Sequence, residues 1–377
     1  MHIGINYTAA LRQGAGIGRY TRGLVQTLAE LDQQNAYTLV ITRDSPQDGL
    51  FPLPPNFQVK VLPLSERWLT ILWHRLYLPL YIDRWAGPFD LFHSPDFVLP
   101  PLKDAVGLVT VHDLSFMRHP DGAVPKLRQW LDQVVPWSIA RATHVLADSH
   151  STQQDLQILL KTPPEKISVV GAGVETRFQP ISDQTRRRQV QQKYQLPPHF
   201  VLGLGTLEPR KNFLGLIQAF EQIAAECPDL HLVIGGGKGW LYDAIFTAAQ
   251  TSIVTDRIHL IGYVADEDLP TLYSLAAVFA YPSHYEGFGI PVLEAMSCGT
   301  PVVTADNSSL PEVAGEAALL VDSNDITGCA QAIKDLVTQP TLRQQKIAAG
   351  LQQADQFRWS VAATKLMSVY KTFSANT

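Results

Sequence analysis

Short β-branched or apolar runs alternate with longer helical stretches along almost the whole of this 377-residue chain. Such alternation predicts βαβ units, whose strands pair in parallel because each helix carries the chain back across the sheet. In the first half, strands are expected at residues 2–6, 37–42, 58–62, 91–93, 107–112, 144–147 and 167–170. Helices are expected at 18–31, 124–142 and 151–160. The pattern therefore predicts an α/β fold with parallel sheets.

A second series of strands begins after residue 198 and predicts a second domain of the same kind. Its expected strands are 200–205, 231–235, 258–261, 278–281, 301–304 and 318–320. The polar segment 179–198, which contains three consecutive arginines and ends in two prolines, is interpreted as the interdomain connection. The length suits two domains that each bury a core. We therefore expect two Rossmann-like domains facing a central cleft, with ligands at the carboxyl ends of the strands.

The composition excludes several classes of protein. With a net charge of -5, the chain lacks the cationic face of a general nucleic-acid binder. Cys227, Cys298 and Cys329 are widely spaced, which predicts reduced cysteines of a cytoplasmic protein. The strand-like opening predicts that there is no signal peptide. No run reaches the roughly 18 apolar residues of a membrane span.

The segment 68–85, rich in Trp, Leu and Tyr, comes nearest to such a span, but charged residues interrupt it. We interpret it as a core helix with a partly exposed aromatic edge. The alternative is a helix at a bilayer surface, which would give the protein a peripheral membrane contact.

The segment 285–296 (YEGFGIPVLEAM) places Glu286 in a Gly-rich loop and Glu294 further on, with Pro291 where a helix would start. A loop that leads into a helix N-terminus offers backbone N–H groups to an anionic, polyhydroxylated ligand. Glu286 would reach that ligand from the loop, and Glu294 from the first turn of the helix. The alternative is a plain helix start whose acidic residues match the macrodipole.

The segment 203–212 (GLGTLEPRKN) follows an expected strand and precedes an expected helix. It begins like a dinucleotide fingerprint, but Glu208 occupies the place of the third glycine, so the evidence for NAD is weak. Arg210 and Lys211 combine a planar fork with a point charge, and this pair suits a diphosphate at a helix entrance. A solvated basic pair is the alternative interpretation.

A second Gly-rich turn, 14–20 (GAGIGRY), joins the first strand to the first helix. Its glycines allow the backbone to approach a ligand closely. It does not end in Lys-Ser or Lys-Thr, so it is not a P-loop. A flexible turn without a binding role is the alternative.

His112 and Asp113 end an expected strand on the cleft side, where a His can exchange hydrogen bonds with a sugar hydroxyl or a reacting oxygen. A structural role is the alternative for this His. The acidic run 266–268 (DED) matches a pattern of metal-dependent sugar transferases, but it precedes an expected helix and is interpreted as its cap. The histidines also lack metal-ligand spacing. We therefore expect a metal-free site, in which Arg210 and Lys211 neutralise a departing diphosphate.

Together these motifs resemble glycosyltransferase family four, the retaining nucleotide-sugar transferases of GT-B fold. The resemblance runs nearly end to end and is strongest at 203–212, 258–272 and 286–303. The segments 93–95 (HSP) and 111–116 (VHDLSF) look most like the mannosyltransferase-type members. One departure is 171–175 (GAGVE), where many members have Pro-Asn-Gly-Val-Asp, and no site residue is assigned there.

The resemblance implies the domain boundaries. The last helix, expected at 360–373, would cross back onto the first domain. The N-terminal, acceptor-binding domain would then comprise 1–180 plus 357–377. The C-terminal, nucleotide-sugar-binding domain would comprise 181–356.

The resemblance also implies roles for individual residues. Arg210 and Lys211 would hold the donor diphosphate, with the N–H of Gly16 reaching it across the cleft. Glu286 would bind the donor sugar together with the amides of Phe288 and Gly289. The ribose would meet Glu294, the base would meet Tyr263 and Val264, and the transferred sugar would meet His112. Gly205 and Gly287 complete the expected donor site.

The expected activity is transfer of a hexosyl group, with mannosyl favoured, from a nucleoside-diphosphate sugar to a glycan, lipid-linked or small-molecule hydroxyl. GDP-mannose is the favoured donor and a UDP-sugar is the alternative, and no cofactor is expected. Three other functions remain open: a sugar-nucleotide 2-epimerase of the same fold, a glycoside hydrolase, and a non-catalytic sugar-nucleotide-binding subunit. A hydrolase would use a carboxylate pair, which would leave the pair Arg210 and Lys211 unexplained.

Overall fold

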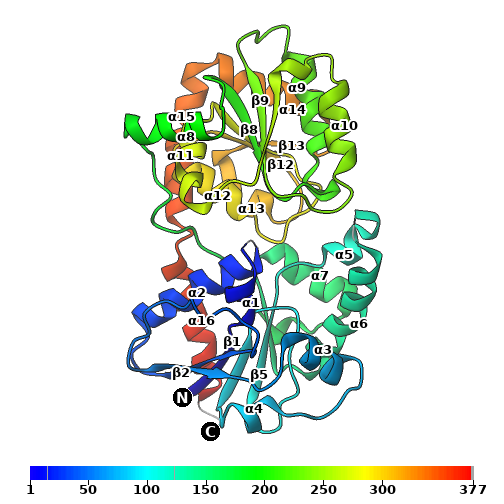
Figure 1. The fold of residues 1–377 in the computed structure, drawn as a ribbon, viewed down its shortest axis with the longest axis vertical. Helices are drawn as coiled ribbons and strands as arrows, with labels where there is room; N and C mark the ends of the chain where they lie inside the picture. Colours follow the sequence, from blue (N-terminus) through cyan, green and yellow to red (C-terminus); the bar gives the residue numbers. More distant parts are fainter. Residues whose placement is uncertain (15, 123, 375–377) are drawn as a thin grey trace. The chain divides into compact units, whose positions relative to one another are not determined.

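The computed structural model describes residues 1–14, 16–122 and 124–374, and the chain folds into two compact units (Figure 1). Unit 1 comprises Met1–Arg118, Pro125–Gly173 and Trp359–Thr377, and unit 2 comprises His119–Val124 and Val174–Arg358. Each unit is an α/β domain built on one parallel sheet. The prediction of two Rossmann-like domains is confirmed.

Unit 1 is built on seven parallel strands in the order β3-β2-β1-β4-β5-β6-β7. The strands are β1 (His2–Asn6), β2 (Ala36–Ile41), β3 (Phe57–Val61), β4 (Leu91–Ser94), β5 (Val106–Val111), β6 (His144–Ala147) and β7 (Ile167–Val169). The strand order reverses direction between β1 and β4, which are neighbours in the sheet. Both of these strands are mostly or wholly buried, as expected for a parallel sheet that helices cover on both faces.

The described helices of unit 1 include a final helix that returns from the end of the chain. They are α1 (Thr8–Arg12), α2 (Ile17–Leu31), α3 (Glu66–His74), α4 (Ile82–Trp85), α5 (Ser115–Arg118), α6 (Pro125–Arg141), α7 (His150–Leu160) and α16 (Trp359–Thr372). The helix α16 packs against α2. The ring of Trp359 lies 5.6 Å from that of Tyr20, and the small Gly23 leaves room for it, because a Cβ there would lie 2.3 Å from the indole.

The segment 68–85 forms two short helices, and the prediction of a single helix is wrong. Residues 75–81 separate α3 from α4. Pro79 disfavours helical conformation in the residue before it, and Tyr77 takes a left-handed φ of 49°. Leu69 is buried in the core of unit 1, whereas Trp68 is exposed. Among the residues that the structure describes, no helix is both long enough and apolar enough to cross a membrane.

Unit 2 is built on six parallel strands in the order β10-β9-β8-β11-β12-β13. The strands are β8 (Phe200–Leu204), β9 (His231–Gly235), β10 (Ile258–Gly262), β11 (Val278–Tyr281), β12 (Val302–Ala305) and β13 (Leu319–Val321). Its α-helices are α8 (Gln184–Lys193), α9 (Phe213–Ile223), α10 (Asp243–Thr251), α11 (Leu269–Leu275), α12 (Ile290–Ser297), α13 (Leu310–Ala314), α14 (Ile326–Thr338) and α15 (Pro340–Asp355). The strand order reverses between β8 and β11. In both units, every predicted strand lies within one residue of the observed one.

The segment 179–198 is part of unit 2, and its interpretation as the interdomain connection is wrong. It carries helix α8, which packs against α11. Asp268 is buried and joins the two elements, because it lies 2.6 Å from Arg186 and 2.6 Å from Lys193 and accepts a hydrogen bond from Tyr194 at 2.7 Å. These contacts fix the polar helix to the domain although it has little apolar surface of its own.

Candidate active site

The loops that follow β8, β9 and β10 meet at the carboxyl edge of the sheet in unit 2. The amide of Gly205 donates to Gly235 O at 3.0 Å, and the amide of Gly236 donates to Gly262 O at 2.7 Å. Gly236 has a φ of 146°, and a Cβ on it would lie 1.8 Å from Gly205 O. The close approach of the two loops therefore requires glycine at this position.

Arg210 and Lys211 lie in a 3-10 turn, Pro209–Lys211, between β8 and α9, as the sequence predicts. The loop after β11 carries Glu286. Because β8 and β11 are the strands between which the order reverses, both loops start at the topological switch point of the sheet. Ligands of open parallel sheets bind at such points. Three residues that the sequence singled out are therefore brought together at the expected place.

These three side chains form an ion-pair cluster in which Lys211 and Glu286 are buried and Arg210 is half-buried. Oε1 of Glu286 lies 2.7 Å from Nζ of Lys211, and its Oε2 lies 2.9 Å from Nη1 of Arg210. Nζ of Lys211 also donates to the hydroxyl of Tyr281 at 2.6 Å. Nη2 of Arg210 lies 2.6 Å from Glu208. Two cations are thus balanced by two carboxylates.

Glu208 was noticed in the sequence only as the residue that breaks the dinucleotide fingerprint. The structure shows it 2% exposed and paired with Arg210. Its position two residues before Arg210 was the available signal, but spacing alone does not show that the two side chains turn toward each other.

Burial and the neighbouring charges shift the pKa values of Glu286 and Lys211. Burial alone would raise the pKa of Glu286, but the charges of Arg210 and Lys211 and the hydrogen bond from Lys211 lower it to about 2. Burial and the neighbouring Arg210 lower the pKa of Lys211 from its ordinary value. Glu286 is therefore a carboxylate at any physiological pH and can accept hydrogen bonds from hydroxyl groups, but it cannot serve as an acid.

The loop before α12 is held by contacts to the serines that precede α13. Ser309 donates its hydroxyl to Glu286 O at 2.9 Å and to Phe288 O at 2.8 Å, and the amide of Glu286 donates to Ser308. Gly289, with φ of 107°, is the residue before the helix. Within the described part of the chain, the amides of Phe288 and Gly289 have no hydrogen-bond partner. They are donors at a helix N-terminus, which suits an electron-rich ligand.

Glu294 lies within helix α12. It is the fifth residue of α12, so the prediction that it belongs to the first turn is wrong. Its side chain is buried and accepts a hydrogen bond from the hydroxyl of Tyr273 at 2.9 Å. Tyr263 and Val264 follow β10 at the carboxyl edge; Tyr263 is 70% exposed, whereas Val264 is buried.

In unit 1, His112 follows β5 and is paired with Asp148 rather than with the adjacent Asp113. Its Nδ1 lies 2.7 Å from Oδ2 of Asp148, and its Nε2 lies 3.3 Å from Pro95 O. Asp113 instead accepts from the amide of Ser115. Burial lowers the pKa of His112, but the charge and hydrogen bond of Asp148 outweigh this and raise it to about 9. His112 is therefore an imidazolium at neutral pH.

Asp148 belongs to the candidate site through its contact with His112, and sequence reasoning missed it. It directly follows β6, the neighbour of β5. The carboxyl ends of neighbouring parallel strands lie side by side, so the available signal was an Asp at the end of an adjacent strand. That signal becomes usable only when the strand order is known.

The Gly-rich segment 14–20 contains the start of α2, and α1 separates it from β1, so the expectation that it joins the first strand to the first helix is wrong. Ala15 lies outside the described residues. Gly16 has a φ of 50° and immediately precedes the helix, and a Cβ on Gly18 would lie 2.0 Å from Gln13 O. The turn therefore needs glycine for its own backbone geometry, whatever it binds.

The acidic run 266–268 forms a 3-10 turn before α11, but Asp268 makes no side-chain cap to the helix. Asp268 does stand at the N-cap position of α11, as interpreted, but its carboxylate is occupied by the contacts to α8 and forms no capping hydrogen bond. Among the residues that the structure describes, no group of three His, Cys, Asp or Glu side chains could hold a metal ion.

Comparisons with known proteins show the family of this chain. Residues 184–353 match the family profile "Glycosyl transferases group 1", and residues 14–178 match "Glycosyltransferase Family 4". The O-antigen chain mannosyltransferase B of Escherichia coli is 36% identical over 284 residues, which are 74% of this chain and 74% of that protein.

Two further similarities are more distant. The serotype-specific mannosyltransferase WbdA of Escherichia coli is 29% identical over 227 residues, which are 59% of this chain and 28% of WbdA. The structure of sucrose-phosphate synthase from Thermosynechococcus elongatus superposes with a TM-score of 0.79 at 21% identity, covering 100% of both chains. That likeness shows the fold, which is GT-B. With both halves of the chain matched and a mannosyltransferase 36% identical, this protein is a glycosyltransferase that belongs to family four.

Proposed function

We propose that this glycosyltransferase moves a mannosyl group from GDP-mannose to a hydroxyl group of a glycan acceptor, with retention of the anomeric configuration. The observation that carries the proposal is the ion-pair cluster of Arg210, Lys211 and Glu286 at the switch point of unit 2. The mannosyltransferase relatives favour mannose over other hexoses. A UDP-sugar donor and a lipid-linked acceptor are the alternatives.

Arg210 and Lys211 are proposed to bind the diphosphate and to stabilise the negative charge that grows on it as the sugar leaves. Glu286 and Tyr281 already hold Lys211 in place, so little reorganisation accompanies donor binding. An ammonium group has three protons. Two of those on Lys211 are taken, and the third has no acceptor among the described residues. That proton is available to a diphosphate oxygen.

The donor sugar and nucleoside complete the proposed site. Glu286 accepts from hydroxyls of the transferred sugar, while the amides of Phe288 and Gly289 donate to it. Glu294 binds the ribose, and Tyr263 and Val264 lie at the base. Gly205 and Gly287 let the backbone approach the donor. Gly16 and His112 of unit 1 belong to the same proposal, with Gly16 at the diphosphate and His112 at the sugar.

The two glutamates are not an acid–base pair in this proposal. The low pKa of Glu286 excludes it as an acid, and the buried Glu294 accepts a hydrogen bond from Tyr273. A glycoside hydrolase, which needs two carboxyl groups that flank one bond, is therefore not supported. No nucleophile is assigned. The reaction is proposed to depend on positioning and on charge stabilisation, without a metal ion.

A cytoplasmic location is part of the proposal. Cys227, Cys298 and Cys329 are all buried and free. Unpaired cysteines are typical of reducing compartments.

The first experiment is a thermal-shift screen of the whole chain against GDP, UDP, ADP and their sugars, followed by transfer assays with the responding donor. We expect GDP and GDP-mannose to raise the unfolding temperature most. We also expect NMR of the product to show the anomeric configuration of the donor. The absence of any shift with all the nucleotides would contradict the donor assignment.

The same assays separate the other functions. Donor incubated without an acceptor would form its 2-epimer if the protein were an epimerase. Donor binding without turnover on any acceptor would indicate a non-catalytic subunit. Inversion of the anomeric configuration would refute the retaining mechanism while leaving the transfer itself established.

A further inference from the structure

Unit 1 contains a pocket at the place where its own strand order reverses. Asn6 ends β1 and Thr8 follows it, Asp96 and Val98 follow β4, and all four line the pocket. The strands β1 and β4 are the neighbours between which the order reverses. The carboxyl edge at such a switch point is the usual ligand position in an open parallel sheet. Unit 1 therefore has a binding location equivalent to the one in unit 2.

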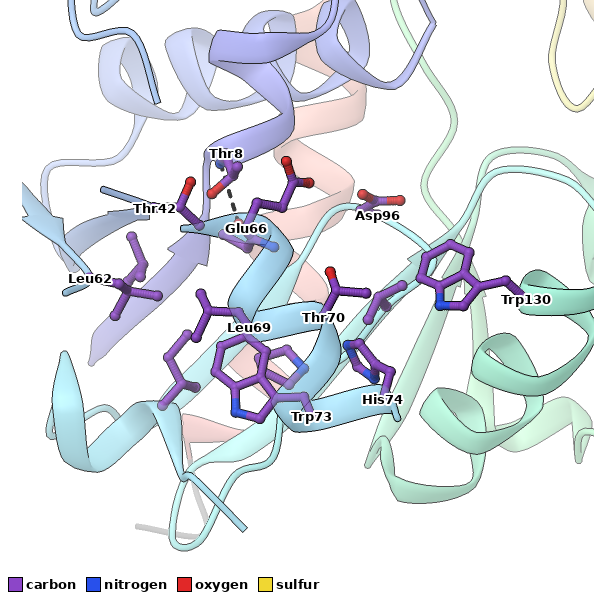
Figure 2. A pocket seen from close by; sticks show the side chains of 15 residues that line it. Thr8, Thr42, Leu62, Glu66, Leu69, Thr70, Trp73, His74, Asp96 and Trp130 are labelled. Carbon is purple, nitrogen blue, oxygen red and sulfur yellow. Dashed lines mark hydrogen bonds between the residues drawn. The ribbon is translucent and has the colours of Figure 1, made fainter. Parts of the chain in front are cut away.

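The pocket combines aromatic surface with hydrogen-bonding groups. Figure 2 shows Glu66 and Asp96 at one end, Trp73 at the other, and Trp130 reaching from α6 toward Thr70 on α3. Its volume is about 620 Å³ when the open mouth is included. That figure counts solvent at the mouth, so the pocket is open and the end of a larger saccharide could enter it.

The charges that line the pocket are negative. Glu66 and Asp96 are both lining residues, and no Lys or Arg is among them. The nearby Arg12 lies 3.2 Å from Glu66 but also 2.7 Å from Asp44, so its charge is already matched. A phosphate or carboxylate group in the pocket would be repelled. The occupant is therefore neutral at the part that enters.

The carboxyl group of Asp96 is close enough to influence that of Glu66. Burial raises the pKa of Glu66, Arg12 opposes this rise, and the charge of Asp96 adds to it. Oδ1 of Asp96 accepts from the amide of Phe97 at 2.6 Å. No other hydrogen bond to this carboxylate is formed by the described residues, so Oδ2 remains available as an acceptor. Hydroxyl groups are the neutral donors that such carboxylates bind best.

Two lining side chains carry ring nitrogens that lack a partner in the described residues. They are Nε1 of Trp130 and Nδ1 of His74, whereas Nε1 of Trp73 donates to Leu80 O at 2.8 Å. Burial lowers the pKa of His74 to about 4, so its ring is neutral. Buried polar atoms usually have partners, and a polyhydroxylated ligand with a small side-chain adjustment would supply them.

The pocket is also linked to His112. The segment 95–97 that carries Asp96 places Pro95 O 3.3 Å from Nε2 of His112, and the ring of Phe97 lies 5.5 Å from the imidazole. The charge of Asp96 helps to raise the pKa of His112. A molecule in the pocket would therefore lie beside the residue proposed to contact the transferred sugar.

We propose that this pocket binds the neutral sugar end of the acceptor, with Trp130 packing against its ring face and Glu66 and Asp96 accepting hydrogen bonds from its hydroxyls. This rests on the proposed function and adds the class of acceptor: an uncharged saccharide terminus rather than a phosphorylated sugar. An aromatic face combined with a few placed acceptors suits a sugar, which has both apolar C–H faces and hydroxyls.

The test measures acceptor binding directly on the whole chain, without donor. Methyl α-mannoside and a neutral mannobiose are titrated by calorimetry or ligand-observed NMR, with mannose 6-phosphate as the anionic counterpart. The variants are Trp130→Ala, Trp130→Phe and Asp96→Asn. The control is Leu127→Ala, an exposed position on the same helix that does not line the pocket. Nucleotide-induced thermal shifts are recorded for every protein.

We expect binding of the neutral sugars to weaken about tenfold or more in Trp130→Ala and Asp96→Asn, with Trp130→Phe in between and Leu127→Ala unchanged. The nucleotide shift stays as in the parent protein. In transfer assays, the KM for the acceptor rises while the KM for the donor stays constant.

Two results would overturn the proposal. One is equal affinity of the parent protein and of folded Trp130→Phe and Asp96→Asn variants for the neutral sugars. The other is tighter binding of mannose 6-phosphate than of the neutral mannosides. Failure of the proposed function is distinguishable, because a protein that binds no nucleotide but binds mannosides in a Trp130-dependent way refutes only the donor assignment.

Discussion

Nζ of Lys211 lies 2.7 Å from Oε1 of Glu286, in a pair whose side chains are only 10% and 8% exposed. Lys211, proposed to bind the diphosphate, and Glu286, proposed to bind the sugar, therefore also stabilise each other. Removing one partner leaves a buried charge without its counterion, whereas removing both charges does not. Function and stability can consequently be separated at this pair.

Lys211→Met is expected to lower the free energy of unfolding by about 3–5 kcal/mol, because Glu286 loses a buried counterion. Adding Glu286→Gln should recover much of that loss, while transfer stays at least about 100-fold below the parent rate in both variants. Urea unfolding and initial rates give the two quantities. Lys334→Met, at a surface pair with Glu226, is the control and should cost about 1 kcal/mol or less. Near-normal transfer in Lys211→Met would refute the diphosphate role.

Arg210→Ala is expected to reduce transfer by about 100- to 1,000-fold, because the guanidinium is proposed to stabilise the leaving diphosphate. Its loss also leaves Glu208 and Glu286 with one cation fewer. GDP should accordingly produce a smaller thermal shift in this variant. An unchanged shift together with an unchanged rate would show that Arg210 only holds the two carboxylates.

Asp148→Asn is expected to lower the pKa of His112 from about 9 toward or below its ordinary value, because the buried imidazolium loses its counterion. The pKa of His112 is raised in the folded protein, so its pairing stabilises the fold fully below about pH 6.5. That stabilisation is lost as the pH rises through 9. The difference in unfolding temperature between the parent protein and Asp148→Asn should therefore shrink between these values. A difference that does not vary with pH would contradict the ion pair, and histidine NMR titration gives the pKa directly.

Gly236→Ala is expected to destabilise unit 2 and weaken donor binding, because its Cβ would lie 1.8 Å from Gly205 O and its φ of 146° is unfavourable for alanine. Gly237→Ala is the matched control, since a Cβ there meets nothing within 4 Å. Thermal unfolding and GDP titration of the two variants give the comparison. Equal behaviour would mean that the two loops separate without cost.

Asp268→Asn is expected to lower the unfolding temperature while leaving the donor KM unchanged, because Asp268 ties α8 to unit 2 through Arg186 and Lys193.

A chelator should leave the transfer rate unaffected in the parent protein. Loss of activity with the chelator, restored by a divalent cation, would refute metal independence. If the chelator lowered the transfer rate of the parent protein but not that of Asp268→Asn, the cation would be assigned to the acidic run 266–268.

The sequence by itself determined where the strands lie, because the positions of buried strands follow from local runs of apolar residues. It also singled out Arg210, Lys211 and Glu286 as candidate site residues, since each stands in a loop with a distinctive local pattern. Segments with little apolar surface were misjudged: helix α8 is held by the buried charge of Asp268, and the break between α3 and α4 depends on Pro79 and the left-handed Tyr77.

Only the tertiary structure decided which side chains meet. His112 pairs with Asp148, 36 residues away, and not with the adjacent Asp113, because β5 and β6 are neighbours and their carboxyl ends lie side by side. In the same way, the sheet order brings the loops after β8 and β11 together and lets Glu286 neutralise Arg210 and Lys211. Sheet order is set by the packing of the whole domain, so no local pattern in the chain specifies these partners.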